Sequence, residues 1–236
     1  MSNAIGTTAP LFTTPYLTIA EFKQAPTAID VDDLVGGGTS AINDQELANV
    51  IGRASSWIDS YCGQVLASTT DTETQRTRMT RDGMLIVHPR FWPITQVVSL
   101  SYGPLPSLLQ PIDVSQLWIE QESVVFPVVG ITSNFIGSLG FTGNYSLTQE
   151  QFVVITYVNG YANTVLTANA SANATTLAVS DRSGFSPNMR FSIYDGSSTE
   201  ICTVASTYTA ATGAGNVTLA SGIQYAHVSG IAASAA

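Results

Sequence analysis

Residues 44–64, DQELANVIGRASSWIDSYCGQ, carry the clearest structural signal in the chain. Apolar or small side chains recur there at three- and four-residue spacing, at Leu47, Val50, Ile51, Ala54, Trp57, Ile58, Tyr61 and Cys62. This spacing places them on one face of an α-helix. Asn43 and Glu46 have the spacing of an N-terminal capping box, and Gly63 is a typical C-terminal stop. The stretch therefore predicts a long amphipathic helix over residues 44–62.

A shorter helix is predicted upstream by the same kind of signal. Thr18 and Glu21 have the spacing of a capping box. Pro26 cannot continue a helix, so we expect this one to span residues 18–25. Between the two helices, the three glycines at residues 36–38 indicate a loop.

After the long helix the pattern changes from helical to β. Apolar and β-branched runs separated by Pro, Gly and Asn predict strands over residues 74–80, 84–87, 94–102, 114–120, 123–129 and 151–158. We expect these strands to form a central antiparallel β region.

A change of composition at residues 160–163 predicts a domain boundary. Beyond it the chain is rich in Ala, Thr, Ser and Gly, and strand signals continue over residues 176–180, 189–194, 200–205 and 217–220. Asp195-Gly196 is typical of a two-residue hairpin turn. We expect a core domain of residues 1–162 and a small β domain of residues 163–236. The charge-poor C-terminal tail, residues 223–236, is either frayed or ordered by a partner, and we favour ordering by a partner.

Together these signals predict an α+β fold. It has N-terminal helices with a long amphipathic helix, a central antiparallel β region and a C-terminal small all-β module.

Charge and composition exclude several classes of protein. Only 11% of the residues are charged, hydrophobic residues make up 44%, and the formal net charge is −9. This composition excludes a mainly disordered chain. Lys and Arg are too few for a protein that coats DNA by releasing counterions. No apolar run reaches the length of a membrane span, about 18 residues, and the N-terminus lacks the features of a secretory signal. We therefore expect a cytoplasmic product with no membrane contact.

Candidates for catalysis are scarce. His88 and His227 are the only histidines, and neither has a second His or a Cys at metal-ligand spacing. The glycine-rich segment 36–40 lacks the Lys of a phosphate-binding loop, and the acidic segment 30–33 lacks the pattern of a calcium loop. We therefore predict no catalytic residue, no metal site and no cofactor, and we do not expect an enzyme. A hydrolase that uses one of the two histidines is the enzymatic alternative.

Three groups of residues are candidates for binding a partner protein. The first is the aromatic pair on the apolar stripe of the long helix, where core or subunit packing uses such side chains. The second is a cluster of arginines in residues 76–90, which holds half of the eight basic residues and favours an acidic partner. The third is an aromatic pair between two prolines, which either fills the core or forms an exposed anchor. These candidates are Trp57, Tyr61, Arg76, Arg78, Arg81, Arg90, Phe91 and Trp92.

The order of these segments resembles one family, the head–tail connector or adaptor proteins of tailed bacteriophages. The resemblance is carried by PYLTIAEFKQAP (15–26), DQELANVIGRASSWIDSYCGQ (44–64), RDGMLIVHPRFWPITQVVSL (81–100) and VVITYVNGYANT (153–164). It covers about residues 15–164. The C-terminal segment resembles small β inserts of some phage connectors. Many family members end in a further helix, whereas this sequence stops at HVSGIAASAA, so either that helix is lost or the sequence is shortened.

The resemblance implies a structural protein of the virion neck, made in the cytoplasm of the host bacterium. Its partners would be copies of itself in a ring, expected as a dodecamer, the portal protein on one side, and a stopper or tail terminator protein on the tail side. Double-stranded DNA would pass through the lumen without specific binding. The alternative function is a β-rich surface or ligand-binding module of a phage or bacterial protein.

Overall fold

The structure is a computed structural model that describes residues 15–24, 30–32, 34–80, 83–120, 122–127 and 150–235. Its contacts divide the chain into two compact units. The terminal unit takes in residues 1–68 and 161–236, and the middle unit is Thr69–Gly160. The chain thus leaves the middle unit close to the expected boundary at residue 162, while the segment expected as one core domain contributes to both units.

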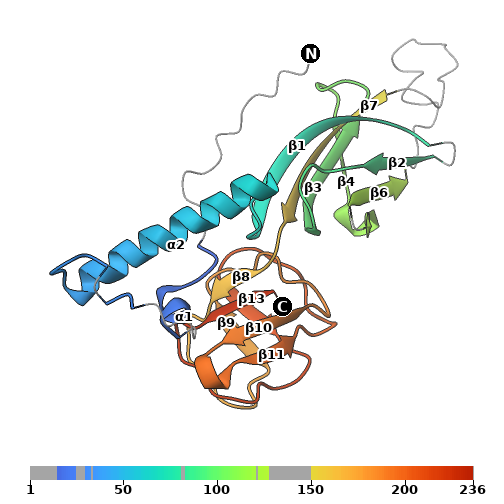
Figure 1. Ribbon diagram of the computed structural model, residues 1–236. Helices are drawn as coiled ribbons and strands as arrows, with labels where there is room; N and C mark the ends of the chain where they lie inside the picture. Colours follow the sequence, from blue (N-terminus) through green and yellow to red (C-terminus); the bar gives the residue numbers. More distant parts are fainter. Residues whose placement is uncertain are drawn as a thin grey trace, which may run out of the picture. The chain divides into compact units, whose positions relative to one another are not determined.

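The middle unit is built from antiparallel strands (Figure 1). They are β1 (Thr69–Arg78), β2 (Met84–Val87), β3 (Ile94–Gly103), β4 (Gln110–Ile112), β5 (Trp118–Glu120), β6 (Ser123–Pro127) and β7 (Glu150–Asn159), with a 3-10 turn η1 at Val114–Gln116. The described strands form one sheet in the order β1-β7-β3-β4 and a second in the order β2-β6-β5. Leu85 and Phe126 of the smaller sheet share a core cluster with Leu100, Ile155 and Tyr157 of the larger one, so the sheets pack against each other.

Strand β1 is longer than its sequence suggests. Thr69–Arg78 pairs along its whole length with β7, from Thr69 opposite Asn159 to Arg78 opposite Glu150. Its side chains alternate between half-buried and exposed, as the period of two requires. The strand is polar throughout, and its pairing with the buried, apolar β7 fixes its structure more than its own composition does.

The short helix of the terminal unit begins as predicted. It is α1, Ile19–Gln24. The capping box is confirmed, because the Thr18 backbone N–H donates to Glu21 Oε2 over 2.6 Å and the Glu21 N–H donates to Thr18 Oγ1 over 3.2 Å. Ile19 and Phe22 then pack against buried residues of the long helix.

The long helix, α2, spans Ser40–Cys62 and ends at Gly63 in the left-handed conformation, as predicted (Figure 1). Its start differs from the prediction, because Asn43 lies buried inside the first turn rather than at the cap. The Asn43 side chain accepts a hydrogen bond from the Val35 N–H over 2.9 Å and donates one to the Asp32 carbonyl. Asn43 therefore connects the preceding loop to the helix instead of capping the helix N-terminus.

The C-terminal part of the terminal unit is a compact β module (Figure 1). Its strands are β8 (Asn163–Val165), β9 (Thr176–Val179), β10 (Arg190–Tyr194), β11 (Glu200–Thr203), β12 (Gly215–Thr218) and β13 (Ala232–Ala235). The described strands form a sheet in the order β11-β10-β13-β8 and a two-stranded sheet of β12 and β9, around a core that includes Phe185, Phe191 and Val217. A 3-10 turn, η2 (Gly196–Ser198), joins β10 to β11 in place of the expected two-residue turn.

The expectation that a partner orders the C-terminal tail is wrong. Residues 232–235 form β13, which pairs with β10 on one side and β8 on the other. Ala233 is fully buried in the module's own core. Small residues suit this place because the strand runs through the middle of a sheet where larger side chains would collide with the packed core.

The expected α+β class is also wrong. Strands account for 41% of the described residues and helices for 18%, so the chain is mainly β. The two α-helices in the described part are α1 and α2, and α2 is not the amphipathic helix that the spacing predicted. Of its apolar stripe only Leu47 and Ile51 are buried, and they share the buried face with Asn43, Ser55 and Asp59. Polar hydrogen bonding rather than an apolar stripe thus decides which face is covered.

Candidate functional site

Helix α2 turns large apolar side chains toward solvent. Trp57 is 83% exposed and Tyr61 is 93% exposed, and Val50 and Ile58 are more than 40% exposed. These four residues lie at helical spacings of i, i+7, i+8 and i+11, so they share one side of the helix, which we call the α2 aromatic face. Within the described terminal unit nothing covers this face.

The predicted arginine cluster lies in the middle unit and is partly engaged within it. The Arg76 guanidinium lies 4.7 Å from the centre of the Phe152 ring, directly across from it on β7. Arg78 pairs with Glu150 over 3.2 Å, and most of the Arg78 side chain stays exposed. Both arginines lie on the exposed face of β1. Arg81 lies outside the described residues.

The sequence left open whether Phe91 and Trp92 fill the core or form an exposed anchor, and the two residues differ in this respect. Phe91 is half-buried, packs against the core of the middle unit, and donates its N–H to the Tyr157 hydroxyl over 3.2 Å. Trp92 is 48% exposed. The Arg90 guanidinium lies 5.2 Å from the Phe91 ring centre. Trp57 and Tyr61 belong to the terminal unit, whereas Arg90, Phe91 and Trp92 belong to the middle unit.

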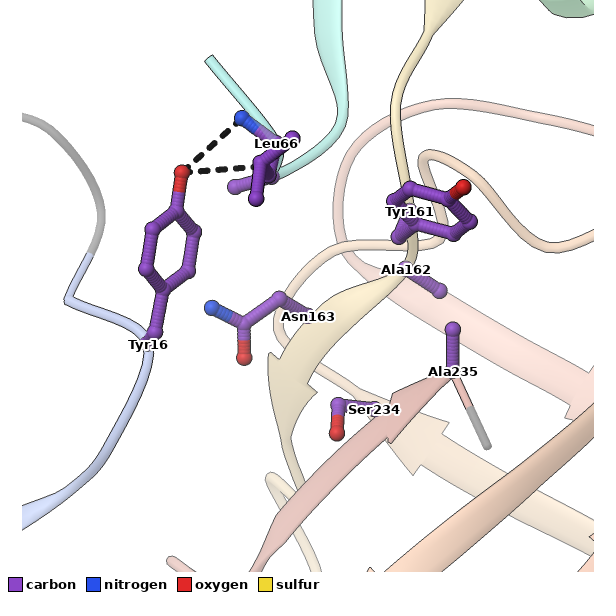
Figure 2. Close-up of a pocket in the computed structure, with 8 residues that line it drawn as sticks. Tyr16, Leu66, Tyr161, Ala162, Asn163, Ser234 and Ala235 are labelled. Atoms are coloured by element: carbon purple, nitrogen blue, oxygen red, sulfur yellow. Dashed lines mark hydrogen bonds between the residues drawn. The ribbon is translucent and has the colours of Figure 1, made fainter. Parts of the chain in front are cut away.

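A groove in the terminal unit was not foreseen from the sequence. It consists of two adjoining hollows that share Ala67 and Asn163, and we call it the Asn163 groove. The first hollow has a volume of about 280 Å³ and is walled by Tyr16, Tyr161 and the end of β13. Figure 2 shows the Asn163 side chain between the Tyr16 ring and the strand that carries Ser234 and Ala235.

The second hollow is the polar half of the groove. It has a volume of about 310 Å³. Its polar side chains come from α1 and its cap, from the 67–68 link and from the β module, and they are Thr18, Glu21, Ser68, Asn163, Thr164, Ser180, Asp181 and Ser183. Two carboxylates and five hydroxyls therefore line it, and no Lys, Arg or His is among its lining residues.

Hydrogen bonds hold the walls of the groove in place. The Tyr16 hydroxyl donates to Asp59 and accepts from the N–H groups of Leu66 and Ala67, over 2.9 and 3.3 Å (Figure 2). Burial and the bond to Asp59 raise the pKa of Tyr16 to about 12, so the hydroxyl keeps its proton. Asn163 Nδ2 donates to the Pro15 carbonyl over 3.0 Å, which joins the N-terminal segment to β8.

His227 is a structural residue in the β module. Its side chain is fully buried, with Nδ1 2.9 Å from Asp195 Oδ2 and Nε2 2.9 Å from Glu200 Oε1. Because protein atoms enclose both ring nitrogens, this histidine is not placed to meet a substrate. His88, the other histidine, is exposed.

Two kinds of feature, clusters of metal ligands and membrane-spanning helices, are absent from the described residues. They contain no group of three or more His, Cys, Asp or Glu side chains placed to hold a metal ion. In the same part of the chain, no helix combines the length and apolar character needed to cross a membrane.

Comparison of the chain with models of protein families, with curated proteins and with solved structures gives no match.

The sequence pattern pointed to Trp57 and Tyr61 as candidate contact residues, but it did not predict the Asn163 groove. The reason is physical. The groove gathers side chains from residues 15–21, 66–68, 161–165, 180–183 and 234–235, which lie far apart in the chain. No spacing rule connects such segments. The one local signal was the change of composition near Asn163, which marked a boundary rather than a site.

Proposed function

We propose that the chain is a structural subunit of a phage neck ring that joins the portal to the tail side and lets double-stranded DNA pass. The observation that carries this proposal is the α2 aromatic face. Trp57 and Tyr61 project almost completely into solvent from a regular helix. Aromatic side chains in this setting are typical of the anchors of protein–protein interfaces.

The size of the apolar contribution supports an assembling subunit. Burying one Trp or Tyr ring removes about 150–250 Å² from water. At about 25 cal/mol per Å², this favours association by roughly 4–6 kcal/mol per ring, before the entropic cost of binding. A chain with only 11% charged residues has few groups to keep such a face solvated. Contact with a neighbouring copy is therefore the use we assign to it.

The distribution of charge favours a ring over a two-fold dimer. Residues 1–75 carry nine acidic and two basic residues, whereas residues 76–90 carry four arginines and one aspartate. Opposite charges on different segments of the chain favour contacts between unlike parts of neighbouring copies, and such head-to-tail contacts close into rings when the rotation between subunits permits. The formal net charge of −9 also suits a lumen through which DNA slides, because binding DNA to an acidic wall releases no counterions.

The experiment is the particle mass of the full chain, alone and mixed with the portal ring of the same phage, measured by mass photometry. We expect a ring-sized particle, at least in the presence of the portal. The double variant Trp57→Ser, Tyr61→Ser is expected to abolish it. Trp118→Ser is the matched control, because Trp118 is a 55% exposed tryptophan on a strand of the middle unit.

Two results would count against the ring. One is a chain that stays monomeric even with its portal present. The other is a double variant that assembles as well as the control.

The alternative function, a ligand-binding β module, is supported by the Asn163 groove, and it does not require the α2 aromatic face.

A further inference from the structure

We propose that the Asn163 groove is a binding site for a neutral carbohydrate. The inference does not depend on the proposed ring, because every residue of the groove belongs to the terminal unit of one chain. It rests on three observations: the division of the groove into an aromatic and a polar half, the sign of its charge, and the hydrogen bonds that fix its walls.

The aromatic half suits the apolar face of a sugar ring. Tyr16 and Tyr161 line the first hollow, and Tyr161 is 47% exposed although it borders a packed module. A pyranose has one face made of C–H groups, which packs on the face of an aromatic ring. Ligand sites combine such apolar walls with a few convergent polar groups, and the first hollow meets the polar half at Asn163.

The polar half suits sugar hydroxyls. A hydroxyl both donates and accepts, and a carboxylate only accepts, so a wall of Ser, Thr, Asp and Glu pairs well with a polyol. Hydrogen bonds from described residues reach Glu21 at Oε2 and Asp181 at Oδ1, so each carboxylate has a second oxygen to offer.

The charge of the groove selects among polar ligands. Two carboxylates and no basic side chain line the polar half, which repels phosphates and acidic sugars. The wall supplies only two carboxylates, and the described residues contain no group of three or more Asp, Glu, His or Cys side chains placed to hold a metal ion. A neutral polyol fits both the carboxylates and the tyrosines.

The groove is also preorganised, which lowers the entropic cost of binding. The Tyr16 hydroxyl is fixed by three hydrogen bonds, and the capping box fixes Glu21 relative to Thr18. Asp181 Oδ1 accepts from the Ser183 N–H over 2.9 Å and from the Ser183 hydroxyl over 2.7 Å. A ligand would therefore meet walls that already hold their positions.

The test uses the ¹⁵N-labelled full chain and four neutral probes: glucose, galactose, mannose and N-acetylglucosamine, each also as a disaccharide. Amide shifts are followed up to millimolar ligand. We expect at least one probe to shift the amides of residues 161–165 and 180–183. Tyr161→Ala and Asp181→Asn are each expected to weaken that binding at least tenfold.

The matched control is Tyr225→Ala, because Tyr225 is a partly exposed tyrosine of the same unit that does not line the groove. This variant is expected to bind the saccharide as the unaltered chain does. The proposal is overturned if no saccharide binds, or if Tyr161→Ala binds as well as the control. It is equally overturned if glucose 6-phosphate or arginine methyl ester shifts the same amides in preference to the neutral sugars.

Discussion

At the scale of single residues, Glu200 connects the parts of the β module that its sequence leaves far apart. It lies on β11, accepts from the backbone N–H groups of Gln224 and Tyr225 over 2.7 and 3.0 Å, and contacts the buried ring of His227. The carboxylate therefore ties the loop before β13 to β11, an edge strand of the sheet. Asp195 completes the arrangement from the other side of the imidazole.

These contacts make the stability of the chain depend on pH. Burial raises the pKa of Glu200, but the hydrogen bonds from Gln224, Tyr225 and His227 lower it by more, so it lies below its ordinary value of 4.5. A carboxyl whose pKa is depressed on folding adds stability above its unfolded pKa, and this stability is lost as the pH falls through the folded value. The contribution of Glu200 is thus complete at neutral pH, begins to decline below its ordinary pKa of 4.5, and is lost as the pH falls through the lower pKa of the folded state.

Replacing Glu200 with Gln is therefore expected to lower the free energy of unfolding at pH 7 by roughly 1–3 kcal/mol. The difference from the unaltered chain should shrink as the pH is lowered to 3. Urea unfolding at both values measures it. Glu122→Gln, at an exposed position of the middle unit, is the control and should change stability little at either pH. A Glu200→Gln deficit that is the same at pH 7 and pH 3 would contradict the linkage.

At the scale of elements, the sequence predicted those features that are formed by residues close together in the chain. The Thr18–Glu21 box and the Gly63 stop could be read from sequence because each is made by residues a few positions apart. Most strand cores of the middle unit were also predicted from their apolar runs. In contrast, β13 has no alternation and no β-branched residue after Ile231, and it is a strand because β8 and β10 pair with it. The Asn163 groove was not predicted for the same reason, because its residues come together only in the tertiary fold.

The position of β13 leads to a prediction about Ala233. Its side chain is fully buried between the two sheets of the β module. Ala233→Asp places a charge there without a partner, which is expected to cost roughly 3–5 kcal/mol of stability. Thermal and urea unfolding of the full chain measure the loss. Ala214→Asp introduces the same charge at an exposed position and should change stability by less than about 0.5 kcal/mol. Equal stability of the two variants would show that β13 is dispensable.

At the scale of the whole molecule, the chain combines surfaces that the proposed ring would use in different ways. The α2 aromatic face supplies apolar contact, while the exposed arginines of β1 supply charge. Apolar contact depends little on moderate salt, whereas attraction between exposed charges is screened over about 10 Å at 0.1 M salt and about 3 Å at 1 M. The salt dependence of assembly therefore separates the two contributions.

We expect ring formation to weaken as NaCl rises from 0.1 to 1 M, because part of the contact is electrostatic. Replacing both Arg76 and Arg78 with Ser should weaken assembly at 0.1 M and flatten its dependence on salt, since the charges that salt screens are gone. The expected effect is moderate, because Arg76 already contacts Phe152 and Arg78 already pairs with Glu150. An exposed charge pair contributes roughly 0.2–1 kcal/mol, so we expect the concentration at the midpoint of assembly to rise about three- to tenfold. Sedimentation velocity across the salt series measures both quantities. Arg190→Ser, at an exposed position of the β module, is the control and should assemble as the unaltered chain does. If the double variant keeps the full salt dependence, the β1 arginines form a solvated strand face and the charge of the interface lies elsewhere.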